Sequence, residues 1–155
     1  MTLNMSGAFS IALATGLSIY VPDYSLLLAS TVSVPSNSYI RMAGGMIKVA
    51  NGLNNHAFRI ANDADNVLLE GLRINGNKAN NTGGVGIAMG GTGGTNIRVR
   101  KSYIWDCSAD GMRFAGTTCV GIEATNNYVT GCVSAGVTGD DTVTKFLFGD
   151  NHTWL

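Results

Sequence analysis

The chain has few charged side chains and very few prolines. Charged residues make up 13% of it, against roughly 25% in typical globular domains, and there are only 2 prolines. The 10 basic and 10 acidic residues balance and no basic run is present, so we expect no nucleic-acid partner. No apolar stretch reaches the roughly 18 residues that a membrane-spanning helix needs, so we expect no membrane partner either.

Cysteine is also scarce. The three cysteines are an odd number and lack the C-x-x-C spacing of metal sites, so the sequence predicts neither a disulfide scaffold nor a metal site, and we expect no cofactor. The 21 glycines, in contrast, stand in a chain that is 45% hydrophobic and rich in Asn, Thr and Ser. This composition is typical of many short strands joined by turns.

The strongest pattern is an internal repeat of 25 residues. Segment 86–107 matches segment 111–132 without a gap, so that Ile97 corresponds to Ile122 and Ile104 to Val129. The register continues backward at a spacing of 30, across a turn-rich insertion at 75–84, and forward at a spacing of 24. Apolar residues alternate at period two within each repeat, which indicates strands rather than helices.

Strands this short cannot bury an apolar face alone, so we expect successive repeats to stack as turns of a coil about 4.8 Å apart. The sequence therefore predicts an all-β fold, a right-handed parallel β-helix (a solenoid) of about five to six rungs, with one domain over residues 1–155. A leucine-rich repeat is the main alternative, but its L-x-x-L-x-L framework is absent. The predicted interior columns are Ile87/Met112/Val137, Val67/Ile97/Ile122/Phe146 and Ile74/Ile104/Val129.

Residues 1–16 are expected to form an N-terminal cap and residues 17–155 the rungs. The cap would contain one short helix over 6–15, with Ser6 as its N-cap, an apolar face that includes Phe9 and Leu13, and Gly16 at its end. A cap of this kind would cover the exposed backbone groups and apolar columns at the open end of the coil.

The same alignment predicts two polar columns at turns. Ser102, Asn127 and Asn151 share one turn position, where stacked side-chain amides could form hydrogen bonds from rung to rung. Cys107 and Cys132 become neighbours, either as two buried thiols or within the range of a disulfide bond.

The order of the elements resembles that of a known superfamily. The helix is followed by GLSIYVPDY, STVSVPSN, YIRMAGG and NVLLEGLRING, an order similar to the N-terminal part of pectate-lyase-like β-helix proteins, above all those of bacteriophage tailspikes and capsule depolymerases. The resemblance implies a polysaccharide partner, a homotrimer, and a place on a virion or outside the cell. Proteins of this group are usually several hundred residues long, so the chain resembles only a part of such a protein.

Sugar polymers are cut by paired carboxylates, and the candidate catalytic residues are Asp110, Asp140 and Asp141. Ser108-Ala109-Asp110-Gly111 is similar to the Asn-Thr-Asp-Gly motif of polygalacturonases, and Asp140-Asp141 is similar to their Asp-Asp pair. The 30 residues between them exceed one rung, and the family's Gly-His-Gly and Arg-x-Lys motifs are absent. The alternative is that these aspartates serve as turn residues. The sequence supports no choice between a polysaccharide lyase, a glycoside hydrolase and a non-catalytic protein.

Candidate binding residues lie on two outward columns. Arg59 and Arg113 occupy the outward positions of corresponding strands, with Ala88 between them, and could hold an acidic sugar bidentately, or they could simply be solvated. Tyr103 and Tyr128 lie one repeat apart and, with Trp105, could form a stacking platform for sugar rings or a subunit interface.

The leading hypothesis is a polysaccharide-binding β-helix of tailspike type. One version of this hypothesis makes the chain a fragment of a capsule or O-antigen depolymerase. The first alternative is a non-catalytic structural or trimerising module. The second is a secreted enzyme similar to pectate lyases or polygalacturonases.

Overall fold

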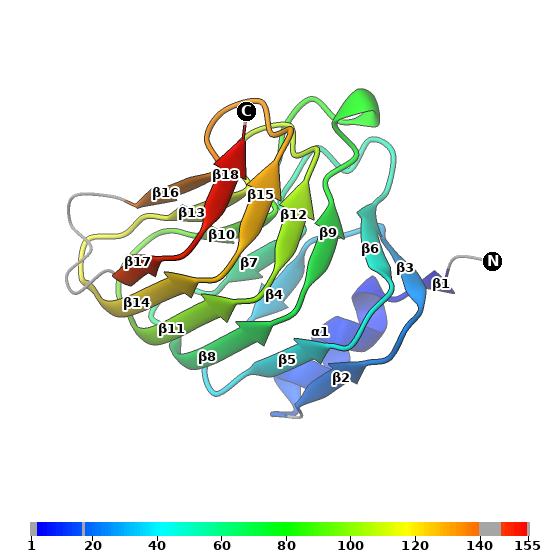
Figure 1. Cartoon of the computed structure of the whole chain (residues 1–155). Coiled ribbons are helices and arrows are strands. Elements are labelled where there is room, and N and C mark those ends of the chain that lie inside the picture. Colours follow the sequence, from blue (N-terminus) through cyan, green and yellow to red (C-terminus); the bar gives the residue numbers. More distant parts are fainter. Residues whose placement is uncertain (1–2, 17, 140–146, 155) are drawn as a thin grey trace.

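The structure is a computed structural model that describes residues 3–16, 18–139 and 147–154. The described chain forms a parallel β-solenoid of about five turns with one short α-helix near its N-terminus (Figure 1). The all-β fold class predicted from the repeat is therefore confirmed. No helix among the described residues is long and apolar enough to cross a membrane.

The strands form three parallel sheets that run along the solenoid. Sheet A contains β1 (Leu3–Asn4), β3 (Ser25–Leu28), β6 (Met46–Val49), β9 (Arg73–Asn75), β12 (Tyr103–Trp105), β15 (Tyr128–Thr130) and β18 (His152–Trp154). Sheet B contains β2 (Ile19–Val21), β5 (Tyr39–Met42), β8 (Asp65–Glu70), β11 (Gly94–Arg100), β14 (Cys119–Thr125) and β17 (Leu147–Gly149). Sheet C contains β4 (Val32–Val34), β7 (Phe58–Ile60), β10 (Ile87–Met89), β13 (Met112–Phe114) and β16 (Val137–Gly139). From β3 onward, each turn visits sheets A, C and B in that order.

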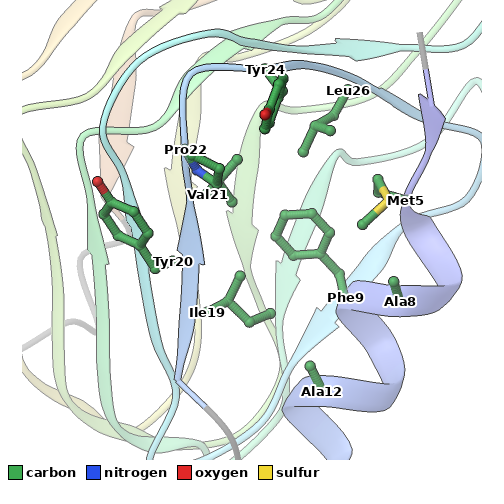
Figure 2. A pocket seen from close by; sticks show the side chains of 10 residues that line it. All are labelled: Met5, Ala8, Phe9, Ala12, Ile19, Tyr20, Val21, Pro22, Tyr24 and Leu26. Carbon is green, nitrogen blue, oxygen red and sulfur yellow. The ribbon is translucent and has the colours of Figure 1, made fainter.

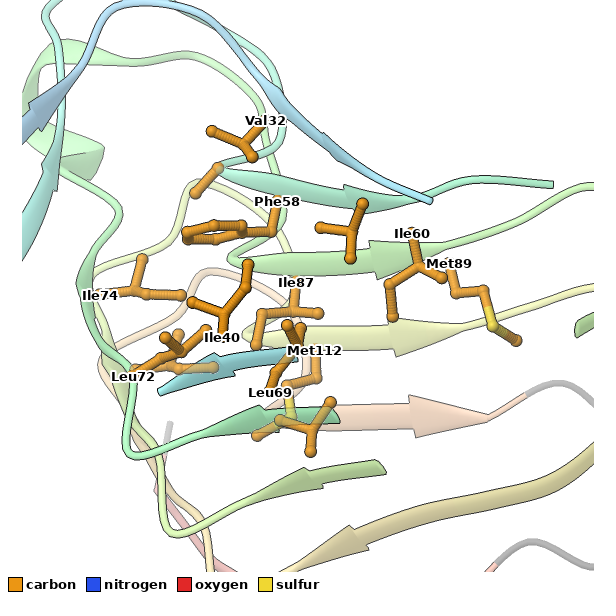
Figure 3. Packing of buried hydrophobic residues seen from close by; sticks show 14 of the residues in the cluster. Val32, Ile40, Phe58, Ile60, Leu69, Leu72, Ile74, Ile87, Met89 and Met112 are labelled. Carbon is orange, nitrogen blue, oxygen red and sulfur yellow. The ribbon is translucent and has the colours of Figure 1, made fainter. Parts of the chain in front are cut away.

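The interior columns follow the predicted register. Ile97 pairs with both Val67 and Ile122, and Ile104 pairs with both Ile74 and Val129. The column Ile87/Met112/Val137 is also present, whereas Phe146 lies outside the described residues. The inward side chains from successive turns pack on one another (Figure 3), and each fully buried Ile, Leu, Met or Phe contributes about 1.5–3 kcal/mol to the stability of the fold.

Turns that repeat at one corner of the solenoid account for part of the Asn and Gly content. Gly71, Lys101, Asn126 and Asp150 occupy the same corner in successive turns, and their φ angles are 69°, 54°, 54° and 50°. This left-handed conformation is natural for Gly and tolerable for Asn and Asp. Lys101 is the exception in this column, since it adopts the left-handed conformation although it is neither Gly, Asn nor Asp.

Helix α1 (Ser6–Ala14) fills a gap in sheet C. It lies in the chain between β1 of sheet A and β2 of sheet B, where every later turn has a sheet C strand. The ring of Phe9 meets the ring of Phe58 edge to face at a centroid distance of 6.0 Å, and Leu13 is also buried. The predicted capping helix is thus confirmed, and Gly16 follows it with a φ of 74°.

The prediction that Ser6 is the N-cap of this helix, however, was wrong. The side-chain oxygen of Asn4 accepts the Ser6 backbone N–H at 3.2 Å, whereas the Ser6 hydroxyl accepts the backbone N–H groups of Ala29 and Ser30. The Ser6 hydroxyl therefore ties the helix to the next turn rather than capping the helix itself.

The insertion at 75–84 is held against the preceding turn rather than standing clear of it. It contains a short 3₁₀ helix, η1 (Lys78–Asn80), followed by the buried Asn81. The Asn81 side chain accepts the Asn54 N–H at 3.0 Å and donates to the Ala50 carbonyl at 3.1 Å. The polar residues of the insertion thus replace strand pairing with side-chain hydrogen bonds.

Candidate functional site

The outer face of sheet C presents one side chain per turn. Ser33, Arg59, Ala88, Arg113 and Thr138 pair in register along β4, β7, β10, β13 and β16. Because alternate residues of a strand point to opposite faces, the buried neighbours on these strands leave this column on the outside. The predicted placement of Arg59 and Arg113 on either side of Ala88 is confirmed.

Two open hollows adjoin along this face, and we call them together the sheet C groove. The first has a volume of about 410 Å³ and is lined by His56, Arg59, Ala88, Gly90 and Arg113, among others. The second has a volume of about 520 Å³ and is lined by Thr31, Ser33, Asn55, Arg59, Ala61 and Asn62. Arg59 lines both, so the two hollows lie next to each other along several turns of the solenoid.

His56 is a groove residue that the sequence did not indicate. Its Nδ1 accepts the backbone N–H of Val85 at 3.2 Å, which leaves Nε2 to carry the proton in the neutral ring. Burial lowers the pKa of His56, and the positive charges of Arg113 and Arg59 lower it further. The two guanidinium groups thus place positive charge beside His56 in the groove.

Asp110 lies beside the groove but is already engaged. It is 6% exposed, and its two oxygens accept the Ala135 backbone N–H at 3.1 Å and the Thr138 hydroxyl at 3.3 Å. The second oxygen also lies 4.0 Å from the Arg113 guanidinium. Asp110 therefore joins two successive turns and orients Arg113.

The other two candidate catalytic residues, Asp140 and Asp141, lie outside the described residues, so the paired-carboxylate hypothesis stays a prediction. Within the described part of the chain, no three His, Cys, Asp or Glu side chains cluster closely enough to hold a metal ion.

The outer face of sheet A carries a continuous column of large side chains, which we call the aromatic row: Arg73, Tyr103, Trp105, Tyr128 and His152. The Tyr103 ring stacks on Trp105 at a centroid distance of 4.7 Å and lies 5.1 Å from Tyr128. Tyr128 in turn lies 6.4 Å from the His152 ring, and the Arg73 guanidinium carbon is 5.8 Å from the Tyr103 centroid. The structure thus brings the three predicted aromatic residues together on one outward surface.

A buried ladder of hydrogen bonds lies directly behind the aromatic row. The Asn127 side chain accepts the Ser102 backbone N–H and donates to the Val99 carbonyl, both at 2.9 Å. Asn151 accepts the Asn127 backbone N–H at 2.9 Å in the same way. The predicted ladder is confirmed, and its three residues immediately precede Tyr103, Tyr128 and His152 in the chain.

A third hollow, of about 300 Å³, lies between helix α1 and strand β2. Figure 2 shows Phe9, Ile19 and Leu26 around this space. Apart from the tyrosines Tyr20 and Tyr24, its lining side chains are apolar. This hollow can offer apolar contacts, but it lacks the charged groups of the sheet C groove.

The chain was compared with known protein families, with curated proteins and with solved structures. None of them matches. The parallel β-solenoid is thus established by the strand register of the chain itself, and the narrower likeness to pectate-lyase-like and tailspike proteins belongs with the proposals below.

Proposed function

We propose that this chain is a polysaccharide-binding β-solenoid of tailspike type, and that the sheet C groove binds acidic sugar chains. The observation that carries the proposal is the placement of Arg59 and Arg113 on either side of a depression with the small Ala88 between them. The proposal includes a place on a virion or outside the cell, where capsule-like and O-antigen-like glycans are found.

The chemistry of the groove suits a charged glycan. Guanidinium groups bind carboxylates through paired hydrogen bonds, and Asp110 holds Arg113 without closing the groove between the two arginines. Beyond Arg59, the second hollow adds Ser33, Asn55 and Asn62, whose neutral donors and acceptors match sugar hydroxyls. One end of the groove therefore suits an acidic group and the other a neutral sugar.

Binding is better supported than catalysis. A base that removes a proton from the substrate needs a free lone pair within hydrogen-bond reach of it. His56 already uses Nδ1 to accept the Val85 N–H, and Asp110 is only 6% exposed, with its oxygens turned toward the next turn of the solenoid rather than toward a ligand. We therefore propose that the described part of the chain recognises the glycan. It could do so within a longer depolymerase.

The test is calorimetric titration with a uronic-acid oligosaccharide and a neutral oligosaccharide of equal length. We expect the acidic ligand to bind more tightly, and Arg59→Ala or Arg113→Ala to weaken it at least tenfold, because each removes a charge-assisted hydrogen bond of about 1.5–3 kcal/mol. Arg41→Ala is the matched control, since Arg41 is exposed on the outer face of sheet B. Equal affinity for both ligands, or arginine variants that bind like the wild type, would refute the proposal.

The aromatic row favours a second function, a homotrimeric structural module. Tyr128 is 41% exposed at the centre of this surface, and exposed aromatic surfaces often mark subunit interfaces. Light scattering of the wild type and of Tyr128→Glu tests this function. A trimer that dissociates in the variant would support the module, and a monomeric wild type would exclude this role for the row.

A further inference from the structure

Cys107 and Cys132 occupy the same position in two successive turns. Each follows its sheet A strand, β12 or β15, by two residues. Backbone hydrogen bonds bracket the pair, from Asp106 N–H to the Thr130 carbonyl at 3.2 Å and from Val133 N–H to the Cys107 carbonyl at 3.0 Å. Such pairing sets neighbouring turns about 4.8 Å apart, which lies within the Cα separation of roughly 4.4–6.8 Å that disulfides require.

The two side chains point in the same direction. The Cys107 thiol lies 3.9 Å from the Trp105 carbonyl oxygen, and the Cys132 thiol lies 3.6 Å from the Thr130 carbonyl oxygen. Glycines of the preceding turn lie next to both sulfurs, since a Cβ added at Gly86 would lie 3.1 Å from Cys107 Sγ and one added at Gly111 would lie 3.4 Å from Cys132 Sγ. Each thiol also shifts the pKa of the other, which is consistent with two sulfurs stacked in successive turns.

The two sulfurs are chemically unequal. The hydrogen bond to Cys132 raises the pKa of Cys107 well above its ordinary value, and burial raises it further. The interaction with Cys107 lowers the pKa of Cys132 most, burial opposes this, and the charge of Lys78 lowers it further. Cys132 is 5% exposed, beside the 67% exposed Val133. Cys132 is therefore the better nucleophile and the one nearer solvent.

The geometry points to Cys107 and Cys132 as a site of reversible covalent modification, a disulfide that joins two successive turns in the presence of a peroxide. The Cys132 thiolate attacks one peroxide oxygen, the O–O bond breaks, and a sulfenic acid and hydroxide form. The Cys107 sulfur then attacks the Cys132 sulfur, the S–O bond breaks, and the proton of Cys107 leaves with the hydroxyl group as water. In total, two thiols lose two electrons and two protons while one hydrogen peroxide becomes two waters. The modification is independent of glycan binding.

Cys119 provides a control within the same chain. It begins strand β14 in sheet B and is fully buried, and its sulfur lies 3.7 Å from the Gly93 carbonyl oxygen. It thus lies in a different sheet from the other two cysteines. None of the three cysteines is disulfide-bonded in the structure.

The test treats the folded full-length chain with hydrogen peroxide and measures its intact mass. We expect the loss of two hydrogen masses and its reversal by a thiol reductant. Cleavage after Lys and Arg, then after Glu, separates all three cysteines, because Arg113 lies between Cys107 and Cys119 and Glu123 lies between Cys119 and Cys132. The expected cross-linked peptide contains Cys107 and Cys132 only.

Two variants sharpen the result. Cys119→Ser should form the cross-link at the wild-type rate, and Cys132→Ser should not form it. A cross-link that involves Cys119, a link between two chains, or a folded wild type that gains oxygen without losing two hydrogens would overturn the proposal. The wild-type peptide map decides this even if a variant fails to fold.

Discussion

The sheet C groove and the aromatic row lie on the same turns of the solenoid. The side chains of the row contact one another, whereas those of the groove leave a hollow between them. In the aromatic row, every turn from Arg73 to His152 contributes a large side chain that contacts the next. On sheet C, the small Ala88 separates Arg59 from Arg113, and a hollow of about 410 Å³ opens there. In a solenoid, a column of large residues fills its own surface, whereas one small residue in the column creates room for a ligand.

The two faces also differ in what fixes their outward residues. Behind the aromatic row, neutral amides bond to the backbone of the neighbouring turn. Beside the groove, the carboxylate of Asp110 accepts a backbone N–H of the neighbouring turn and also lies near the Arg113 guanidinium. A nearby carboxylate can hold a guanidinium in one direction, so Asp110 helps to fix the direction of Arg113. We therefore expect substitutions in the row to change stability and substitutions in the groove to change affinity.

The largest effect on stability should come from Asn127→Ala. This change removes a buried amide and leaves the Ser102 N–H and the Val99 carbonyl without their partner, at about 1–3 kcal/mol for each buried unsatisfied group. We expect the free energy of unfolding to fall by about 2–3 kcal/mol in urea denaturation, with the affinity of the groove for acidic glycans unchanged.

Asn96→Gly is the matched control for this prediction. Asn96 belongs to an exposed ladder, in which it donates to the Asn66 side chain at 2.9 Å. Its φ of 54° is one that Gly adopts freely, as Gly121 does at the corresponding position with a φ of 69°. We expect a loss below about 0.5 kcal/mol, and an equal loss in both variants would show that burial of the ladder contributes nothing.

A smaller effect is expected from Tyr103→Ala, which removes ring contacts with Trp105 and Tyr128. Aromatic pairs contribute about 0.5–1.5 kcal/mol beyond the area they bury, and Tyr103 is partly buried. We expect an unfolding free energy lower by about 1–2 kcal/mol in urea titration, with unchanged binding of acidic oligosaccharide. Arg113→Ala should show the reverse, and a loss of glycan affinity in Tyr103→Ala would assign the ligand to the row instead.

The interior and the buried ladder could be predicted because the repeat fixes them. Inward residues such as Ile97 and Ile122 must recur at a constant step if strands stack, so one gapless alignment of the sequence locates the columns. The same alignment placed Asn127 above Ser102, since both precede a strand of sheet A.

The corners of the groove could not be predicted in the same way. His56 and Val85 lie in register, 29 residues apart like Phe58 and Ile87, but nothing in the repeat marks a histidine at this corner as a groove residue. The second ladder of Asn37, Asn66 and Asn96 recurs at steps of 29 and 30 residues, so the repeat locates its positions but does not show that their side chains bond to one another. Corner chemistry depends on local backbone geometry, and the residue pattern specifies that less strictly than it specifies the core.

The smallest effect is a pH dependence of stability that should come from His56. Burial and the two arginines lower the pKa of His56 in the folded chain, while in the unfolded chain it has the ordinary value of about 6.5. The unfolded chain then binds more protons at mildly acidic pH, so stability is complete above about pH 6.5 and declines as the pH falls below that value. His56→Gln, which keeps an acceptor for the Val85 N–H, should flatten this decline in urea denaturation at a series of pH values, and an unchanged decline in that variant would contradict the assignment.

An acidic glycan in the groove should change the same titration. A bound carboxylate beside Arg59 and Arg113 offsets their charges, so it should raise the pKa of His56 toward its ordinary value. Proton NMR of the His56 ring measures this directly. A pKa of His56 that the acidic ligand leaves unchanged would mean that the ligand does not bind in the groove.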